Sequence, residues 1–447
     1  MKKSKEGGQD ESYLKWWHLS LLGTGCIIGT GFFLASSLAI SLTGPAVIIA
    51  FLLASFGTYS VYHFLARLMT DDPQKGSFHT YARKAYGRWA GFSSGWVYWG
   101  SEMLIMGSQM TALSIFSKFW FPDIPLWIFA AGYSVLGILV VLTGSKGFDR
   151  IENIFGVVKI AAILMFIIVA GVALTGTLNK NPDSVNLPET FSQFFPNGFT
   201  GFWSALIYAF YAFGGIEIMS MMSIRLKDKK DASKSGRIML LLITSIYIIS
   251  LGLAVLLVSV DAFDANESPF VTALDKHDFP FFPHVFNGAL IIAGFSTMVA
   301  SLFAVTSMLV TLAKDGDAPA FFGKEGKGKI DLHLPALGLT VIGMIFSIIF
   351  SLLLPEKIFE YITTAAGLML IYNWFFILLY SKRLLEMKGF DHIKRFGSMA
   401  FVLLAVSGTL LEKTSRIGFF VSLAFVVVIG LVIIKMRKRW QQRPQDS

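Results

Sequence analysis

Three ionisable side chains stand inside long apolar stretches of the sequence: Glu102, Lys159 and Glu217. A charge at the centre of a membrane helix costs about 2.5 to 3.5 kcal/mol on insertion scales, so each should face protein or water and have a function. The ammonium group of Lys159, once buried, can exchange a proton. Three alternatives remain open: a fixed ion pair for Lys159, a helix cap for Glu217, and lateral packing for Glu102.

The glycine-rich stretch 23–31, Gly-Thr-Gly-Cys-Ile-Ile-Gly-Thr-Gly, lies in the middle of the first apolar segment. Each glycine costs a helix interior about 1 kcal/mol relative to alanine, and we predict that the helix is broken here. In hydrocarbon the released N–H and C=O groups need other partners. The break therefore predicts a polar cavity in which the amides of the second half-helix bind an anionic group.

A second interruption, at residues 211–217 (Tyr-Ala-Phe-Gly-Gly-Ile-Glu), falls five spans after the first. Two glycine-interrupted segments in corresponding halves indicate an inverted-repeat transporter with its site at the bilayer midplane. Glycine also lets helices approach closely, so a packing role is the alternative at both places. Aromatic residues near the two interruptions, Tyr98, Tyr211 and Phe213, are candidates for lids over a small ligand, with core packing as the alternative.

The composition indicates a polytopic membrane protein. Of 447 residues, 54% are hydrophobic and 15% charged, and the mean hydropathy is +0.62. The net charge of +9 comes from basic residues in short loops beside apolar spans, which is typical of membrane orientation and not of nucleic-acid binding. The single cysteine, Cys26, excludes an internal disulfide and a cysteine metal cage. Motifs for phosphate loops, zinc proteases or serine hydrolases do not occur, so we expect no enzyme.

Apolar blocks of bilayer-spanning length predict about twelve transmembrane helices. They lie near 16–42, 45–69, 88–120, 124–144, 151–176, 200–224, 238–260, 284–313, 334–354, 357–381, 396–412 and 417–436. Most lysines and arginines fall in the two tails and the even-numbered loops, which places both termini in the cytoplasm. No cleavable signal peptide precedes the first block. Residues 70–87 are amphipathic enough to lie along the cytoplasmic interface, as a gate element or as a plain turn.

Several motifs together resemble the amino-acid permeases of the APC (amino acid, polyamine and organocation) superfamily. They are Gly25-Cys-Ile-Ile-Gly-Thr-Gly-Phe-Phe-Leu34, Gly76-Ser-Phe-x-x-Tyr-Ala-Arg83, Trp89-Ala-Gly-Phe-x-x-Gly-Trp-x-Tyr-Trp99, Tyr208-Ala-Phe-Tyr-Ala-Phe-Gly-Gly-Ile-Glu217 and Leu312-Ala-Lys-Asp-Gly-Asp-Ala-Pro319. The resemblance covers nearly the whole chain. It implies an all-α membrane protein with the 5+5 inverted repeat of leucine transporters and broken helices 1 and 6.

On this fold the chain divides into four parts. Residues 1–15 form a cytoplasmic tail, 16–381 the ten-helix transport core, 396–436 two additional helices, and 437–447 a second cytoplasmic tail. Within the core, repeat one covers about 16–176 and repeat two about 200–381.

The family pattern assigns roles to individual residues. It implies that the substrate carboxylate binds around Gly29, Thr30 and Gly31. The substrate ammonium would bind carbonyls near Ile27, Phe213 and Gly214. Further implied or inferred roles are an aromatic gate at Tyr211 and Tyr98, proton coupling at Lys159 and Glu217, and a substrate contact at Glu102. Glu102 departs from the usual apolar or aromatic residue at its position.

The sequence thus predicts a secondary transporter of the cell membrane that takes up a neutral amino acid with a proton. Lys159 matches a lysine that replaces sodium in some relatives, so sodium coupling is disfavoured and no cofactor is expected. The expected partners are a small amino acid and the lipid bilayer, with no nucleic acid, and the oligomeric state is left open. Two alternative functions are an amino-acid/amine exchanger and a non-transporting amino-acid receptor of the same fold.

Overall fold

The computed structural model describes residues 14–74, 76–175, 186–275, 281–324, 333–353 and 357–442. Regular structure in these ranges is helical, apart from one isolated parallel bridge between Leu14 and Leu226. The longer helices are α1 (Trp16–Ile27), α3 (Ala35–Thr43), α4 (Val47–Asp71), α5 (Ser77–Tyr86), α6 (Arg88–Lys118), α7 (Leu126–Val141), α8 (Gly144–Leu174), α10 (Gly198–Tyr211), α12 (Asp231–Leu257), α14 (Phe282–Lys314), α15 (Leu334–Leu353), α16 (Ile358–Leu384), α17 (Gly389–Gly408) and α18 (Lys413–Gln442). Short helices are α2 (Thr30–Phe33), α9 (Phe191–Phe194), α11 (Ile216–Met222) and α13 (Pro269–Asp275), with single 3-10 turns at Gly44–Ala46, Ser223–Arg225, Val260–Ala262 and Ala320–Gly323.

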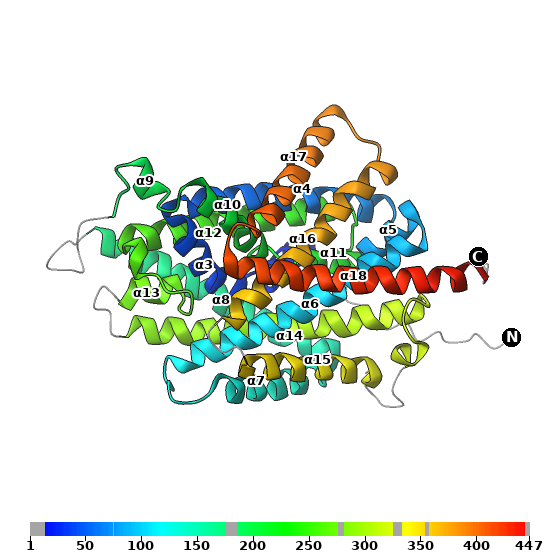
Figure 1. The fold of residues 1–447 in the computed structure, drawn as a ribbon, viewed down its shortest axis with the longest axis horizontal. Coiled ribbons are helices and arrows are strands. Elements are labelled where there is room, and N and C mark those ends of the chain that lie inside the picture. Colours follow the sequence, from blue (N-terminus) through cyan, green and yellow to red (C-terminus); the bar gives the residue numbers. More distant parts are fainter. Residues whose placement is uncertain are drawn as a thin grey trace.

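These helices form an integral membrane protein. In the described residues, seven helical segments are long and apolar enough to cross a bilayer: Thr30–Asp71, Ile154–Leu174, Phe191–Arg225, Asp231–Leu257, Phe282–Lys314, Ile358–Leu384 and Lys413–Arg437. Two shorter apolar helices, Leu126–Val141 and Leu334–Ile349, lie side by side along one edge (Figure 1). Helices occupy all twelve predicted apolar blocks, so the predicted all-α class is confirmed.

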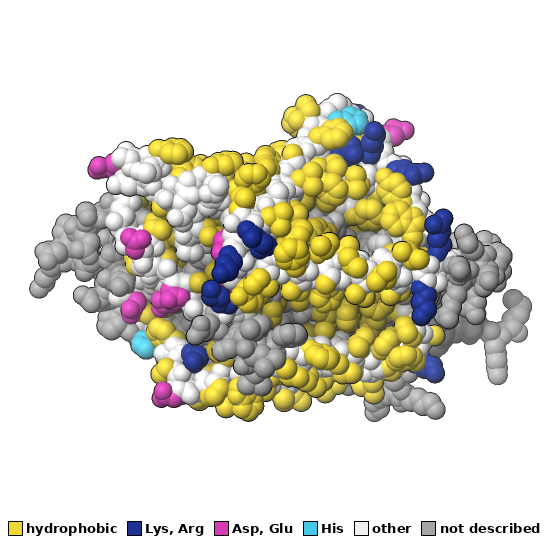
Figure 2. All heavy atoms as spheres, viewed as in Figure 1, with side chains coloured by type: hydrophobic (Ala, Val, Ile, Leu, Met, Phe, Trp, Pro, Cys, Tyr) yellow, Lys and Arg dark blue, Asp and Glu magenta, His cyan; other side chains and the backbone are white. Residues whose placement is uncertain are grey.

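The surface agrees with a bilayer setting. Hydrophobic side chains cover the middle of the molecule, and charged side chains lie toward its two ends (Figure 2). Lysines and arginines line the end where α18 finishes, and the opposite half carries most of the visible acidic groups together with further basic ones (Figure 2). Large apolar side chains such as Ile434 and Val157 are 70% and 68% exposed. Exposed apolar area of this extent is stable only against lipid or a partner.

The order of elements repeats along the chain. A broken span (α1–α3, then α10–α11) is followed by a long helix (α4, then α12), a short helix (α5, then α13) and another long helix (α6, then α14). Corresponding helices also pack together: α4 against α12, α6 against α14, and α7 against α15. This order is the one expected of two five-span repeats.

Helices α5 and α13, which follow α4 and α12, lie at opposite ends of the molecule and are held by different contacts (Figure 1). At the α5 end, His79 Nε2 lies 2.8 Å from Asp315 Oδ2, and Arg88 Nε lies 2.8 Å from Asp317 Oδ1. At the α13 end, Phe270 packs against Phe32 and Phe286, with ring centroids 5.0 and 5.9 Å apart. One end is therefore held by ion pairs and the other by aromatic packing.

The first apolar span is broken within the glycine-rich stretch 23–31, as predicted. Ile28 and Gly29 separate α1 from α2, and Gly23 and Gly25 lie within α1. A Cβ on Gly23 would meet Met219 Sδ at 2.8 Å, and one on Gly25 would meet Glu152 Oε1 at 3.1 Å. These two glycines therefore serve close packing, which is the alternative given for the glycines of the interruptions.

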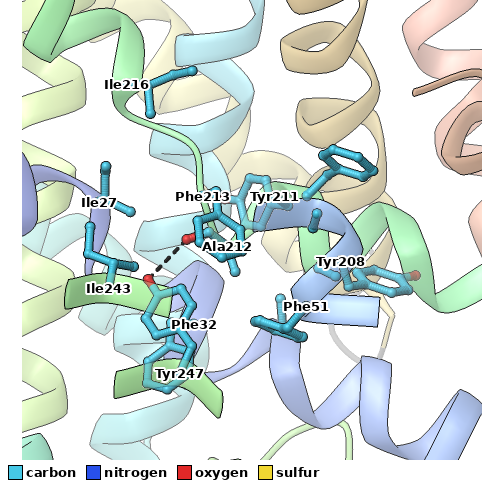
Figure 3. Close-up of a cluster of buried hydrophobic side chains, with 14 of the residues drawn as sticks. Ile27, Phe32, Phe51, Tyr208, Tyr211, Ala212, Phe213, Ile216, Ile243 and Tyr247 are labelled. Atoms are coloured by element: carbon cyan, nitrogen blue, oxygen red, sulfur yellow. Dashed lines mark hydrogen bonds between the residues drawn. The ribbon is translucent and has the colours of Figure 1, made fainter. Parts of the chain in front are cut away.

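Tyr247 of α12 connects the two broken spans. Its ring stacks on Phe32 of α2 with centroids 3.8 Å apart, and its hydroxyl donates to the Ala212 carbonyl over 3.0 Å. Figure 3 shows this contact inside a cluster of buried side chains that includes Phe51 and Phe213. The cluster packs the two breaks together on one side.

Candidate functional site

The two breaks lie against each other. Gly215, the residue before α11, has a φ of +115°, a conformation that a side chain would strain. A Cβ at Gly215 would lie 3.3 Å from the Cys26 carbonyl oxygen, and one at Gly31 would lie 3.2 Å from the Tyr211 ring. Glycine at these two positions is what allows the broken backbones to touch.

A small enclosed cavity of about 30 Å³ lies at this junction. Its wall comes from both breaks and from α6 and α14: Cys26, Ile27, Gly29, Gly31, Glu102, Ile105, Gln109, Tyr211, Gly214, Gly215, Ile218, Thr297, Ala300 and Ser301. One water needs about 10 to 15 Å³ of such space, so the cavity holds only a few waters and an amino acid enters only if the walls separate. The geometry is that of a closed site.

Six of the predicted site residues line this cavity and five do not. The six are Ile27, Gly29, Gly31, Glu102, Tyr211 and Gly214. Thr30, Tyr98, Phe213, Lys159 and Glu217 are buried outside its lining.

Two of the predicted lids pack elsewhere. The Phe213 ring lies in the aromatic cluster, 5.2 Å from the Tyr247 ring (Figure 3). The Tyr98 ring packs edge-on against Phe78 of α5 at 4.7 Å. Tyr211 is the predicted aromatic residue that lines the cavity.

The first break exposes backbone amides to the junction. The amides of Gly29, Thr30 and Gly31 donate to no acceptor within the described ranges. The Thr30 hydroxyl is also buried without a partner there. These groups begin α2, where the helix dipole adds partial positive charge, so this end suits an anion.

A cation contacts the other side of the first break. Lys159 of α8 donates from Nζ to the Gly25 carbonyl over 2.6 Å, near the end of α1. A cation is favourable at the C-terminal end of a helix.

Lys159 also forms an ion pair that sequence analysis missed. Its Nζ lies 3.4 Å from Glu152 Oε1, and the second oxygen of Glu152 accepts from Ser296 of α14 over 2.6 Å. Glu152 and Lys159 are seven residues apart, two turns of one helix face, and this spacing is the signal that could have found the pair. The fixed ion-pair alternative for Lys159 is thus present in the structure.

The second break has the opposite arrangement. Glu217 lies at the start of α11, where its Oε2 accepts from the Gly215 amide over 3.2 Å. Its Oε1 accepts from the indole N–H of Trp374 on α16. Glu217 therefore caps the amide end of α11, as one alternative for it proposed.

The carbonyl end of the second break stays open. The Phe213 and Gly214 carbonyls, which follow α10, accept no hydrogen bond in the described part of the chain. A charged side chain thus contacts each break, but the Ile27 carbonyl at the end of α1 accepts no hydrogen bond among the described residues. The open groups are the amides that begin α2 on one side and the carbonyls of Ile27, Phe213 and Gly214 on the other, which is the polarity that a zwitterion requires.

The remaining wall of the cavity is polar. Glu102 of α6 is 1% exposed and its Oε2 has no hydrogen-bond partner among the described residues. The Thr297 hydroxyl of α14 donates to Gln109 Oε1 across the wall, and Ser301 lies beside the Glu102 carboxyl. Gln109, Thr297 and Ser301 were not predicted, because single hydroxyl and amide groups in apolar spans often serve only their own helix.

Fold and site together define a helical membrane transporter with two broken spans around a buried polar junction. The model of the family described as "Amino acid permease" matches residues 18–410. The chain belongs to this family.

Named relatives carry the comparison over nearly the full length. The chain is 54% identical over 432 residues to the uncharacterized transporter YcgH of Bacillus subtilis, with 96% of each chain covered. It is 27% identical to the probable threonine/serine transporter YbxG of Bacillus subtilis, over 95% of each chain. It is 28% identical to the aromatic amino acid transport protein AroP of Escherichia coli K12, over 84% of this chain and 82% of AroP.

Proposed function

We propose that the protein takes up a neutral amino acid together with a proton, by alternating access around the junction of the two breaks. The observation that carries this proposal is the pair of open half-helix ends of opposite polarity beside one cavity. Two relatives are named for neutral substrates, threonine/serine and aromatic amino acids, which supports the same class. Glu102 and Glu217 near the site disfavour an acidic side chain, because a second carboxylate would be repelled.

The open ends divide the substrate between them. The carboxylate binds the amides of Gly29 and Gly31 and the amide and hydroxyl of Thr30. The ammonium binds the carbonyls of Ile27, Phe213 and Gly214. Tyr211 closes over the bound substrate.

The proton acts through Lys159. When charged, Lys159 holds the Gly25 carbonyl of α1 and pairs with Glu152 of α8. Loss of its proton removes the ion pair and weakens the attachment of α1 to α8, so that α1 can move and widen the cavity. Glu217 is the second coupling group, because its carboxylate caps the start of α11.

The basic end of the molecule faces the cytoplasm in this proposal. Lysines and arginines line the end where α18 finishes, and most of the visible acidic groups lie in the other half, so the positive-inside rule places the α18 end in the cytoplasm. Both termini then lie inside the cell.

Uptake into proteoliposomes tests the proposal. Purified protein is reconstituted, and labelled amino acids are offered with and without an inward proton gradient. We expect gradient-driven accumulation that Lys159→Ala abolishes; undiminished proton-driven uptake by this variant would remove the coupling claim. Exchange that needs substrate on the far side would indicate an exchanger, and a thermal shift without flux would indicate a receptor.

A further inference from the structure

The part of the cavity wall formed by α6 and α14 faces the position of the substrate side chain. A zwitterion held between the amides of α2 and the carbonyls after α10 must point its side chain at α6 and α14, which supply the rest of the lining. The chemistry of that wall therefore selects the side chain. This step rests on the proposed function.

Most of the wall is built from hydrogen-bonding side chains. Glu102, Gln109, Thr297 and Ser301 line it, and Ile105 and Ala300 are its apolar members. A wall selecting leucine or phenylalanine would bury these polar groups unpaired against hydrocarbon, which is unfavourable.

One acceptor on this wall is unused. Glu102 Oε2 is buried and has no hydrogen-bond partner of good geometry in the described ranges, although the hydroxyls of Ser301 and Tyr98 lie beside the carboxyl. A substrate hydroxyl can donate to this oxygen and accept from Ser301 at the same time. A hydroxyl on the substrate side chain would thus satisfy the wall.

The wall also limits the length of the side chain. Thr297 donates to Gln109 and so ties α14 to α6 across the cavity. Gly29 packs closely on Thr297, since a Cβ there would lie 2.7 Å from the threonine Oγ1. A long or aromatic side chain would have to separate α6 from α14.

We propose that the protein selects amino acids with a short hydroxylated side chain, serine and threonine, and that Glu102 and Ser301 recognise the hydroxyl. Threonine and valine have nearly the same shape and differ in one hydroxyl. A site built to bind a hydroxyl rejects the analogue that lacks it by several orders of magnitude, because its own polar groups stay unpaired.

The test compares uptake of labelled threonine and labelled valine by the full-length protein in proteoliposomes. We expect kcat/KM for threonine to exceed that for valine at least tenfold. A preference below tenfold, or faster transport of lysine or phenylalanine than of threonine, would overturn the inference and leave amino-acid transport standing. Transport of none of the twenty amino acids would refute the proposed function itself.

Variants locate the discrimination. Ser301→Ala should lower the ratio of kcat/KM for threonine to that for valine about tenfold. Glu102→Leu should abolish this preference. Glu102→Gln keeps a hydrogen-bonding group and should retain part of the preference. Ser114→Ala on α6, the helix of Glu102, is the control. The Ser114 hydroxyl donates to the Met110 carbonyl over 2.8 Å, and Ser114 lies outside the cavity lining. An unchanged ratio in both Ser301→Ala and Glu102→Leu would contradict the assignment.

Discussion

The two broken spans solve the same problem with opposite charges. At the first break a lysine from α8 bonds the Gly25 carbonyl, while the Ile27 carbonyl and the amides that begin α2 stay open. At the second break a glutamate accepts from the Gly215 amide, and the carbonyls after α10 stay open. The protein thus places one charged side chain at each break and leaves amides of the first break and carbonyls of both breaks for a ligand. The difference teaches that Lys159 and Glu217 shape the site from outside the cavity.

Removing the cation at the first break should have the largest effect. Lys159→Met leaves Glu152 buried without its positive partner, and breaking a buried pair in this way costs about 3 to 5 kcal/mol. Thermal unfolding in detergent measures the loss. The double variant with Glu152→Gln should recover most of it, and a single variant as stable as wild type would show that the pair does not hold α1.

Removing the anion at the second break should cost less. Glu217→Ala leaves the Trp374 indole N–H and the Gly215 amide without an acceptor, and we expect a loss of about 2 to 3 kcal/mol in unfolding free energy. Glu217→Gln keeps one acceptor oxygen, so its unfolding free energy should lie between those of wild type and Glu217→Ala. Equal melting of the alanine and glutamine variants would argue against a capping role.

Replacing the Thr30 hydroxyl with a methyl group should lower substrate affinity without lowering the stability of the fold. Thr30→Val replaces a buried hydroxyl that has no partner, so the protein should be as stable as wild type or more so, while substrate affinity falls about tenfold. Thr24→Val is the matched control, because the Thr24 hydroxyl bonds the Ser20 carbonyl within α1. Thermal melting and equilibrium binding report both effects; unchanged affinity in Thr30→Val would remove Thr30 from the site.

An ion pair outside the membrane should matter least. A hydrogen bond from His79 holds the pKa of Asp315 below its usual value, so its contribution is full at neutral pH and is lost as the pH falls through that lowered value. The carboxylate is partly exposed, so Asp315→Asn should cost less than about 1 kcal/mol. Melting curves across the acid range should show a smaller acid-side decline for the variant than for wild type.

The fold could be predicted from the sequence more completely than the site. Long apolar blocks predict the helices, and two glycine interruptions predict the broken spans, because both signals are local in the chain. Which glycines form the first break could not be predicted, since Gly23 and Gly25 serve packing against residues remote in sequence. The partners of the buried charges were beyond prediction for the same reason: Trp374 reaches Glu217 from 157 residues away. Glu152 was a missed local signal, two helical turns from Lys159.

The central claim is that the two open ends bind the two charges of one zwitterion. Binding of the preferred amino acid to the purified protein should be compared with binding of its carboxamide and of its N-acetyl derivative, by calorimetry in detergent. We predict that each blocked analogue loses at least a hundredfold in affinity, because each removes the charge that one open end receives. An analogue that binds within a few-fold of the parent would contradict the account, because the corresponding break would then not hold the substrate.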